Sequence, residues 1–257
     1  MSGPPGRAAV VTGAAHGIGR AAARCLASGG DRVAILDCDL HGARRTAAEL
    51  AADGLDVASF GCDVSDAAQV TAAFAEVKAQ FGQIDVLVNN AGVNAAFDLL
   101  AMSEDDWDRF FAIDLKSAWL CAREAVPDMR ERGSGAIVNV ASIHSSMTRA
   151  GMFPYAAAKS GVVGLTRTMA IELGGQGIRV NAVCPGYIAT EPVIAKLRAE
   201  PDPALAERRV RANHPLGRIG EPDEVANAIA FLASEQASFI TGATLAVDGG
   251  LSARFAT

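Results

Sequence analysis

Several features that mark membrane, nucleic-acid or metal-binding proteins are missing from this sequence of 257 residues. Acidic residues outnumber basic residues by 29 to 23, and the net charge of -6 disfavours binding to polyanions. No apolar run is long enough to cross a bilayer, and the first residues lack the basic segment and apolar stretch of a secretion signal. We therefore expect a cytoplasmic protein that binds neither nucleic acid nor a membrane.

Cysteine is scarce and follows no pattern. The five cysteines form no CxxC pair and show no zinc-ligand spacing; they are Cys25, Cys38, Cys62, Cys121 and Cys184. An odd, scattered set of this kind is typical of reduced, buried thiols in a cytoplasmic protein. We therefore predict reduced thiols and no metal site.

Repeats and low-complexity linkers are also absent, and short apolar runs alternate with stretches of helical periodicity. Half of the residues are hydrophobic and only 20% are charged, as in compact globular chains. The apolar runs lie at residues 8–11, 32–37, 56–63, 84–92, 136–142, 178–186 and 244–250. Strands that alternate with helices form right-handed crossovers and a parallel sheet covered on both faces. The sequence therefore predicts a single α/β domain over residues 1–257, a Rossmann-like, doubly wound parallel sheet of about seven strands.

A glycine-rich segment, TGAAHGIG at residues 12–19, follows the first run and precedes a predicted helix. Gly13 would permit the tight turn, Gly17 the close approach of a phosphate, and Gly19 the packing of the helix near the sheet. The start of that helix offers free N–H groups and partial positive charge to a pyrophosphate. We therefore predict a dinucleotide site here, which includes His16 and Ile18 beside Gly17.

Asp37 ends the second run, 18 residues after Gly19. A carboxylate at this spacing accepts hydrogen bonds from the adenosine ribose, and its charge would repel the 2′-phosphate of NADP. His16 lies where a cation for that phosphate would otherwise stand, and a neutral imidazole leaves the preference unchanged. We therefore predict NAD in preference to NADP. The alternative for Asp37 is a solvated strand-end residue or a helix cap, a role that suits Asp39 better.

Small and polar residues end the third and fourth runs at the same expected edge of the sheet. The predicted contacts to the adenine and along the nucleotide are Asp63, Val64, Asn90, Ala91 and Gly92. Asparagine and glycine at strand ends also satisfy backbone groups in tight turns. For Asn89, a purely structural role that ties neighbouring strands together is an equal alternative.

Five motifs occur in order along the chain: TGAAHGIG at 12–19, NNAG at 89–92, Ser142, YAAAK at 155–159 and PG at 185–186. Together with PLGRIGEPDEVA at 215–226 and VDGG at 247–250, they resemble the short-chain dehydrogenase/reductase family, in its compact subtype, from Arg7 to about Leu251. The resemblance implies a single Rossmann-like domain, a nicotinamide dinucleotide and, commonly, a homotetramer. It also implies contacts to the nicotinamide from Pro185, Gly186, Ile188 and Thr190.

The resemblance assigns the chemistry to three residues. Tyr155 would be the general acid/base, Lys159 its activator and a contact to the nicotinamide ribose, and Ser142 the hydroxyl that holds the substrate oxygen. The spacing supports this independently, because Tyr155 and Lys159 are four residues apart and share a helix face. A phenol has a pKa near 10, and lowering it to about 7 takes roughly 4 kcal/mol of anion stabilisation. The lysine and the positive nicotinamide ring are the nearest sources of that stabilisation, and such a tyrosine would accept the alcohol proton as hydride leaves the same carbon.

One position departs from the family pattern. Family members usually have Asn in the helix that reads AIDLKSAW here, whereas this chain has Asp114. The family Asn holds, largely through its main chain, a water that connects to the lysine. Asp114 can keep that role, and an ionised carboxylate would instead change the charge around Lys159 and the proton relay. We retain Asp114 as a fourth catalytic residue.

The segment after Gly186 has no strand pattern. Residues 187–215 contain two short helical pieces split by Pro201 and Pro203, and we expect them to form a mobile lid. The predicted substrate contacts are Asn94, Ser142, His144, Tyr155 and Tyr187. If His144 lines the pocket, a polyol, a sugar or another hydroxylated small molecule is favoured over a steroid or a long acyl chain. The alternative is that the polar stretch 142–149 is simply solvated.

Two other functions stay open. A 3-oxoacyl-(acyl-carrier-protein) reductase usually prefers NADPH, which Asp37 opposes, and docks an acidic carrier on basic residues, for which Arg130 and Arg132 are present. A catalytically silent NAD-binding protein is the third hypothesis, with Asp114 as the first sign of decay. The intact Tyr155 argues against it.

Overall fold

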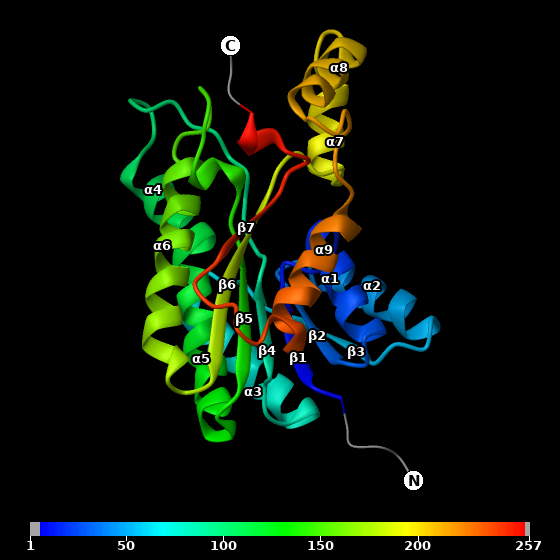
Figure 1. The fold of residues 1–257 in the computed structure, drawn as a ribbon, viewed down its shortest axis with the longest axis vertical. Coiled ribbons are helices and arrows are strands. Elements are labelled where there is room, and N and C mark those ends of the chain that lie inside the picture. Colours follow the sequence, from blue (N-terminus) through cyan, green and yellow to red (C-terminus); the bar gives the residue numbers. More distant parts are fainter. Residues whose placement is uncertain (1–5, 255–257) are drawn as a thin grey trace.

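Seven parallel strands form one sheet in the order β3-β2-β1-β4-β5-β6-β7 (Figure 1). The computed structural model describes residues 6–254, so the first five and last three residues of the predicted domain lie outside it. The strands are β1 (Ala8–Thr12), β2 (Arg32–Asp37), β3 (Val57–Gly61), β4 (Val86–Asn89), β5 (Gly135–Val140), β6 (Ile178–Pro185) and β7 (Thr244–Val247). Each coincides with one of the predicted runs, and the predicted fold class is confirmed.

Helices cover both faces of the sheet, as Figure 1 shows. They are α1 (Gly17–Ser28), α2 (Leu40–Ala52), α3 (Ala67–Phe81), α4 (Glu104–Phe111), α5 (Ser117–Arg132), α6 (Tyr155–Gly174), α7 (Glu191–Arg198), α8 (Pro203–Asn213) and α9 (Pro222–Ala233). Alternate residues of a strand point to opposite faces. Accordingly, Ala9 and Val11 of β1 join a core with α1, α2 and α9, whereas Ala8 and Val10 join a second core with α3, α5 and α6. Burial of both faces explains the uninterrupted apolar strands.

Several strands end before the predicted runs do. β4 ends at Asn89 rather than at residue 92, and β5 ends at Val140 rather than at residue 142. Contacts with neighbouring strands continue for one or two residues beyond these ends: the N–H of Ala141 donates to the carbonyl of Val183 in β6, and the N–H groups of Asn90 and Ala91 donate to the Thr12 hydroxyl in β1. Asp63, two residues beyond β3, accepts hydrogen bonds from the backbone N–H and the hydroxyl of Ser65. The predicted site residues therefore lie in loops at the carboxyl edge of the sheet, where ligands of such sheets bind.

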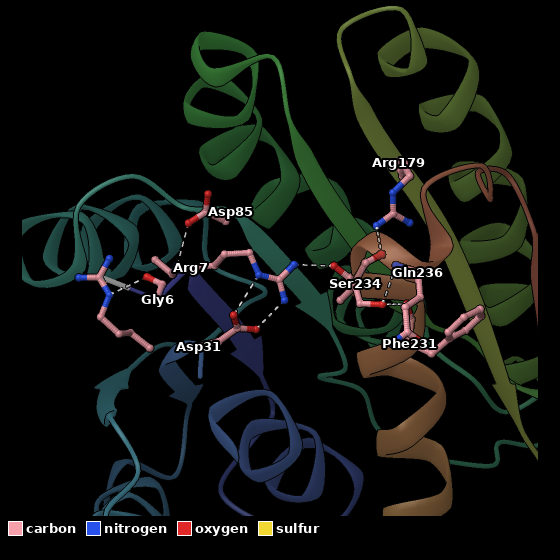
Figure 2. A network of polar contacts seen from close by, with 11 residues as sticks. Gly6, Arg7, Asp31, Asp85, Arg179, Phe231, Ser234 and Gln236 are labelled. Atoms are coloured by element: carbon pink, nitrogen blue, oxygen red, sulfur yellow. Dashed lines mark hydrogen bonds and ion pairs between the residues drawn. The ribbon is translucent and has the colours of Figure 1, made fainter. Parts of the chain in front are cut away.

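The opposite edge of the sheet is held by arginine contacts (Figure 2). Arg7 precedes β1 and makes a two-pronged ion pair with Asp31, with N–O distances of 2.9 and 2.8 Å, and it also donates to the carbonyl of Ala233 at the end of α9. Arg179 in β6 donates to the carbonyl of Ser234, 2.9 Å away. These contacts join β1, β2 and β6 to the end of α9, at a distance from the predicted site.

The predicted lid forms the two helices α7 and α8, which extend beyond the carboxyl edge of the sheet (Figure 1). They are separated at residues 199–202, and Pro203 begins α8. The prediction of two short helical pieces split at the prolines is confirmed. No helix among the described residues is long and apolar enough to span a membrane.

The prediction that all five cysteines are buried is wrong for two of them. Cys62, Cys121 and Cys184 are buried, and burial raises the pKa of each thiol, that of Cys62 to about 12. Cys25 is half-buried, because it lies where α1 meets α9 and its thiol contacts Asn227. Cys38 is exposed, because it follows the carboxyl end of β2 at the ligand edge.

Candidate active site

The glycine-rich loop between β1 and α1 is packed against the loop after β4. Gly13 has φ of +63°, and a Cβ on it would lie only 2.7 Å from Cα of Ala91. The side-chain amide of Asn90 donates to the carbonyls of Thr12 and Gly13, both at 2.9 Å. A Cβ on Gly19 would in turn approach Cα of Ala14 to 2.8 Å. The tight turn at Gly13 and the close packing at Gly19 are therefore as predicted.

Thr12 has a structural role that the sequence analysis did not identify. Its hydroxyl accepts hydrogen bonds from the backbone N–H groups of Asn90 and Ala91, at 3.0 and 3.1 Å, and lies 3.4 Å from the carbonyl of Val88. In the sequence, the only indication of this role is the position of the threonine, immediately before the first glycine of the motif. It fixes the two loops relative to each other.

Asp37 is buried at the end of β2, with 6% of its surface exposed. Its Oδ2 accepts from the N–H of Ala15 and its Oδ1 from the N–H of Asp39, both at 2.9 Å. A carboxylate has about four acceptor positions, so two bonds leave capacity for ribose hydroxyls. The helix cap is Asp39 rather than Asp37: its side chain caps α2 by accepting a hydrogen bond from the N–H of Gly42.

Asn89 ties strands together, as the structural alternative predicted. Its buried side-chain amide donates to Asn139 of β5 at 2.8 Å and to the carbonyl of Ala118 of α5 at 3.3 Å. Val64 is also buried, in the core that α3 and α5 share, so its side chain contributes to packing. The residues that follow β3 therefore offer Asp63 and backbone groups to the site.

Tyr155 and Lys159 lie on one face of α6, as their spacing predicted. Pro154 precedes the helix and Tyr155 is its first residue. The Nζ of Lys159 lies 5.6 Å from the centre of the Tyr155 ring and 3.4 Å from the carbonyl oxygen of Val140, the last residue of β5. Lys159 is 5% exposed, so its charge acts in a poorly solvated environment.

Asp114 supplies the carboxylate that faces this lysine. It lies in η1 (Ala112–Lys116), a π-helical turn between α4 and α5 that the sequence analysis read as ordinary helix; such turns are frequent at functional sites. Its Oδ1 is 3.2 Å from Nζ of Lys159, and its Oδ2 accepts from the N–H of Val93 at 3.0 Å. Burial raises the pKa of Asp114, and the positive charge of Lys159 opposes that rise.

Gly92 leaves the space that this ion pair occupies. A Cβ at this position would lie 2.9 Å from Oδ1 of Asp114 and 3.1 Å from Nζ of Lys159. Any larger residue would have to displace one of the two charged groups. The glycine that ends the NNAG motif therefore leaves room for the ion pair, because it has no side chain.

Ser142 lies two residues beyond β5 and is buried. Its oxygen accepts from the N–H of His144 at 3.2 Å, which leaves its own hydroxyl proton available to a ligand. The His144 ring meets the Tyr155 ring edge-on, with centres 5.9 Å apart, and bonds to the hydroxyl of Thr148. Burial, and secondarily the charge of Arg149, lowers the pKa of His144, so its imidazole is neutral at pH 7.

Two adjoining cavities bring these residues together. The first, of about 350 Å³, is lined by all four predicted catalytic residues, Ser142, Tyr155, Lys159 and Asp114. The predicted cofactor contacts around it are Ile18, Asn90, Gly92, Pro185, Gly186, Ile188 and Thr190. The second, of about 370 Å³, is lined by all five predicted substrate contacts: Asn94, Ser142, His144, Tyr155 and Tyr187. Ser142 and Tyr155 line both cavities and so stand between them.

The remaining predicted cofactor residues do not line these two cavities. They are Gly13, His16, Gly17, Gly19, Asp37, Asp63, Val64 and Ala91. They lie along the carboxyl ends of β1 to β4, in the direction expected for the adenosine half of a dinucleotide. The stretch after Ser142 and the lid, which the sequence already suggested as pocket lining, contribute further residues that were not named singly: Val193 and Lys196 of α7 in both cavities, and Arg149 and Arg209 in the second. These residues follow no motif, and only the folded arrangement identifies them.

Comparisons with known proteins agree with this geometry. The family model described as enoyl-(acyl carrier protein) reductase matches residues 13–252. The cis-4-hydroxycyclohexanecarboxylate dehydrogenase of Sinomonas cyclohexanicum is 46% identical over 96% of this chain and 97% of its own. A 3-oxoacyl-(acyl-carrier-protein) reductase of Staphylococcus aureus is 40% identical over 95% of this chain and 98% of its own. The structure of a gluconate 5-dehydrogenase from Burkholderia cenocepacia J2315, in complex with NADP and tartrate, superposes with a TM-score of 0.90 at 36% identity, over 98% of this chain and 97% of that one. The chain therefore belongs to the short-chain dehydrogenase/reductase family and is an oxidoreductase.

Proposed function

We propose that this protein is an NAD-dependent dehydrogenase that transfers hydride between a secondary alcohol of a hydroxylated small molecule and the nicotinamide, with Tyr155 as general acid/base. One observation carries this proposal. Tyr155 and Ser142 line both a cavity that contains Ile18, Lys159 and Thr190 and a second cavity that residues of the lid helices α7 and α8 line. A reacting carbon between the two cavities is within reach of both hydroxyls.

The residues present fit a nicotinamide dinucleotide. Gly17, with φ of +59°, and the free start of α1 form a cradle without side chains for the pyrophosphate. Asp37 and Asp63 would hold the adenosine half, and Pro185, Gly186, Ile188 and Thr190 would hold the nicotinamide half, together with Lys159. When bound, the cofactor supplies the hydride acceptor.

The proton steps belong to the chain's own residues. The Tyr155 oxygen accepts the proton of the substrate hydroxyl, while the Ser142 hydroxyl donates a hydrogen bond to the same oxygen and orients it. Lys159 stabilises the phenolate through its charge, which burial makes more effective. Asp114 is a positioning residue that holds Lys159 by charge. In the reverse direction Tyr155 donates the proton to the carbonyl oxygen.

The preference for NAD rests on Asp37 and its neighbourhood. The Asp37 carboxylate is fixed by two backbone N–H groups, so it cannot swing away from a 2′-phosphate without losing both. Asp39 and the exposed Cys38 follow it, and neither offers a positive charge. The related gluconate 5-dehydrogenase binds NADP in its structure, so the preference is a property that we propose for this chain's own residues.

The second candidate function is reduction of 3-oxoacyl groups on a carrier protein, which the resemblance to the Staphylococcus aureus enzyme favours. The expected docking residues are less suited to it than the sequence indicated. Arg132 is engaged in an ion pair with Asp85, at 2.6 Å, and Arg130 is therefore the stronger remaining candidate of the two. NADPH oxidation with a 3-oxoacyl carrier protein, compared with NAD reduction by small alcohols, separates the two functions.

Lid movement and assembly are further parts of the proposal. A Cβ on Gly17 would lie 3.4 Å from Cγ2 of Thr190, the residue before α7, so the lid begins against the glycine loop and can respond to what binds there.

For the homotetramer, the exposed Phe239 and Leu245 at the β7 edge offer apolar surface to another copy. Light scattering in solution tests the tetramer.

A substrate panel tests the proposed function. NADH formation is measured with secondary alcohols of different size and polarity, with NAD and NADP in parallel. We expect turnover with NAD for at least one small hydroxylated substrate. Binding of NAD without turnover of any alcohol or ketone would contradict the dehydrogenase proposal and favour a silent NAD-binding protein.

A further inference from the structure

We propose that the substrate of this site is a hydroxy acid: a secondary alcohol on an apolar carbon skeleton that carries a carboxylate, which Arg149 and Arg209 bind. The proposal rests on the proposed dehydrogenase function and deepens it by naming the substrate class. The 370 Å³ cavity beside Tyr155 has the size of a small-molecule site.

The cavity wall has an apolar part and a charged part. Its reactive end is formed by the hydroxyls of Ser142 and Tyr155. Six apolar side chains contribute to the rest of the wall: Ile143, Met152, Val193, Leu197, Ala206 and Val210. Aliphatic walls bury carbon rather than hydroxyl groups, because a polar group buried without a partner is costly. The apolar part of the wall suits the carbon skeleton of a ring or chain, while Asn94, His144, Tyr187 and Asn213 add neutral polar groups to the lining.

The charged part of the wall is mainly positive. Arg149 lies in the loop after η2 (Ile143–Ser145), Lys196 in α7 and Arg209 in α8, and Glu200 is the one carboxylate among the lining residues. Within residues 6–254, none of the three cations makes an ion pair. A protein with a net charge of -6 thus presents three unpaired cations and one anion at this cavity.

The arginines of α8 differ in their surroundings: Arg208 also makes no ion pair among the described residues, but it does not line the cavity. On α8, Arg211 pairs with Glu207 on its own helix, with donor–acceptor distances of 3.0 and 2.6 Å, whereas Arg209 faces the cavity and has no such partner among the described residues. Arg149 acts on the interior of the site, since its charge contributes to lowering the pKa of His144. Guanidinium groups match carboxylates with two parallel hydrogen bonds. A carboxylate between Arg149 and Arg209 would complete the charge balance.

The two arginines come from different elements that line the cavity. Arg149 belongs to the loop that leads from Ser142 to Tyr155, and Arg209 belongs to the lid. A carboxylate that contacts both would therefore also hold the lid against the active-site loop. Lys196 lines the cofactor cavity as well, so it is left out of the test.

The test compares a hydroxy acid with neutral alcohols. Initial rates with saturating NAD are measured for cis-4-hydroxycyclohexanecarboxylate, its methyl ester and cyclohexanol, in the parent protein and in the Arg149→Gln and Arg209→Gln variants. We expect kcat/KM for the acid to exceed that for the ester by about tenfold or more, and each substitution to lower it by about tenfold, as for a lost hydrogen bond to a charged group. Each substitution should lower kcat/KM for the acid much more than kcat/KM for cyclohexanol, because cyclohexanol has no carboxylate for the arginines to bind.

Arg208→Gln is the matched control. Arg208 is exposed on α8 next to Arg209 but does not line the cavity, so its loss should leave kcat/KM for the acid unchanged. Raising the ionic strength from about 0.02 to about 0.2 M should lower kcat/KM for the acid and leave kcat/KM for cyclohexanol unchanged. Equal turnover of acid and ester, or Arg149 and Arg209 variants no worse than Arg208→Gln, would overturn the carboxylate site and leave the dehydrogenase function standing. Failure of all three alcohols, with NAD bound, would overturn the hydroxy-acid proposal, and failure of every alcohol and ketone of the wider panel as well would overturn both.

Discussion

Asp114 and Lys159 form a buried ion pair in the centre of the site, with 3.2 Å between Oδ1 and Nζ and side chains that are 0% and 6% exposed. The neutral Asn expected at this position in the family would place no negative charge beside the lysine. A carboxylate adds a negative charge that reduces the field of the lysine at Tyr155. The chemistry proposed here therefore proceeds next to a partly neutralised cation.

Replacing Asp114 by Asn should shift the pH dependence of alcohol oxidation. The variant lacks the negative charge, so the full field of Lys159 acts on Tyr155 and the acidic limb of the kcat profile should move to lower pH by about one unit. Because burial raises the pKa of Asp114, its carboxyl is charged only above that raised pKa. The two profiles should therefore differ on the acidic limb above that pKa, where Asp114 is charged, and coincide on the high-pH plateau, where the acid/base is deprotonated in both proteins.

The measurement is kcat against pH for both proteins at saturating NAD and alcohol. Far-UV circular dichroism checks that the variant is folded. Superimposable profiles would contradict a charged Asp114, and would mean that its carboxyl is already neutral in the active protein.

Replacing Asp37 by Asn should change the cofactor preference. The substitution removes the charge that opposes a 2′-phosphate but keeps an acceptor for one of the two backbone N–H groups. We expect the ratio of kcat/KM for NAD to that for NADP to fall by about tenfold or more. Asp39→Asn is the control, since Asn is also a good helix cap. An unchanged ratio in the Asp37 variant would argue against its ribose role.

A methyl group on Gly92 should damage the site without unfolding the protein. The added Cβ would come within 3.1 Å of both Asp114 and Lys159, and Gly92 is exposed at the ligand edge. Gly92→Ala should lower kcat by about tenfold or more, as expected when a reacting group is displaced. Gly164→Ala is the control on α6: nothing lies within 4 Å of its added Cβ, and it should stabilise the helix by about 0.5–1 kcal/mol. Equal activity of the two variants would show that the ion pair tolerates displacement.

Loss of the Arg7 side chain should weaken the fold and leave the chemistry intact. Arg7→Gln breaks the two-pronged pair with buried Asp31 and the bond to Ala233, and the unfolding free energy should fall by about 2 kcal/mol. Arg20→Gln, which removes an exposed pair with Glu49, should cost less than about 1 kcal/mol. Urea unfolding measures both. Equal losses in the two variants would contradict a special role for the pair with Asp31.

Much of the fold could be predicted from the sequence, because strand and helix periodicities differ and both faces of a parallel sheet are covered. Strand ends were less predictable. Ser142 reads as the end of a strand. β5 ends at Val140, but Ala141 still donates to the carbonyl of Val183 in β6 and Ser142 is extended, so the chain turns only from Ile143, where the Ser142 hydroxyl accepts from His144. The π-helical turn at Asp114 has no sequence signal, because its residues are ordinary helix formers.

The local motifs identified the reacting groups but not their surroundings. Tyr155 and Lys159 are four residues apart, so their shared face follows from helix geometry. The meeting of Asp114 with Lys159 depends on the packing of η1 against α6, which no local pattern encodes. Arg149 and Arg209 are 60 positions apart in elements without motifs, and only the fold brings them to one cavity.

The most direct test of the account is the Tyr155→Phe substitution. It removes the hydroxyl that accepts the substrate proton and keeps the ring beside Lys159 and His144. The measurement is NADH formation with the best alcohol of the panel, together with NAD affinity by fluorescence titration. We predict a loss of turnover of about 1,000-fold or more, within the range of a lost general base, at unchanged NAD affinity. Substantial remaining turnover would contradict Tyr155 as the acid/base and, with it, the proposed mechanism.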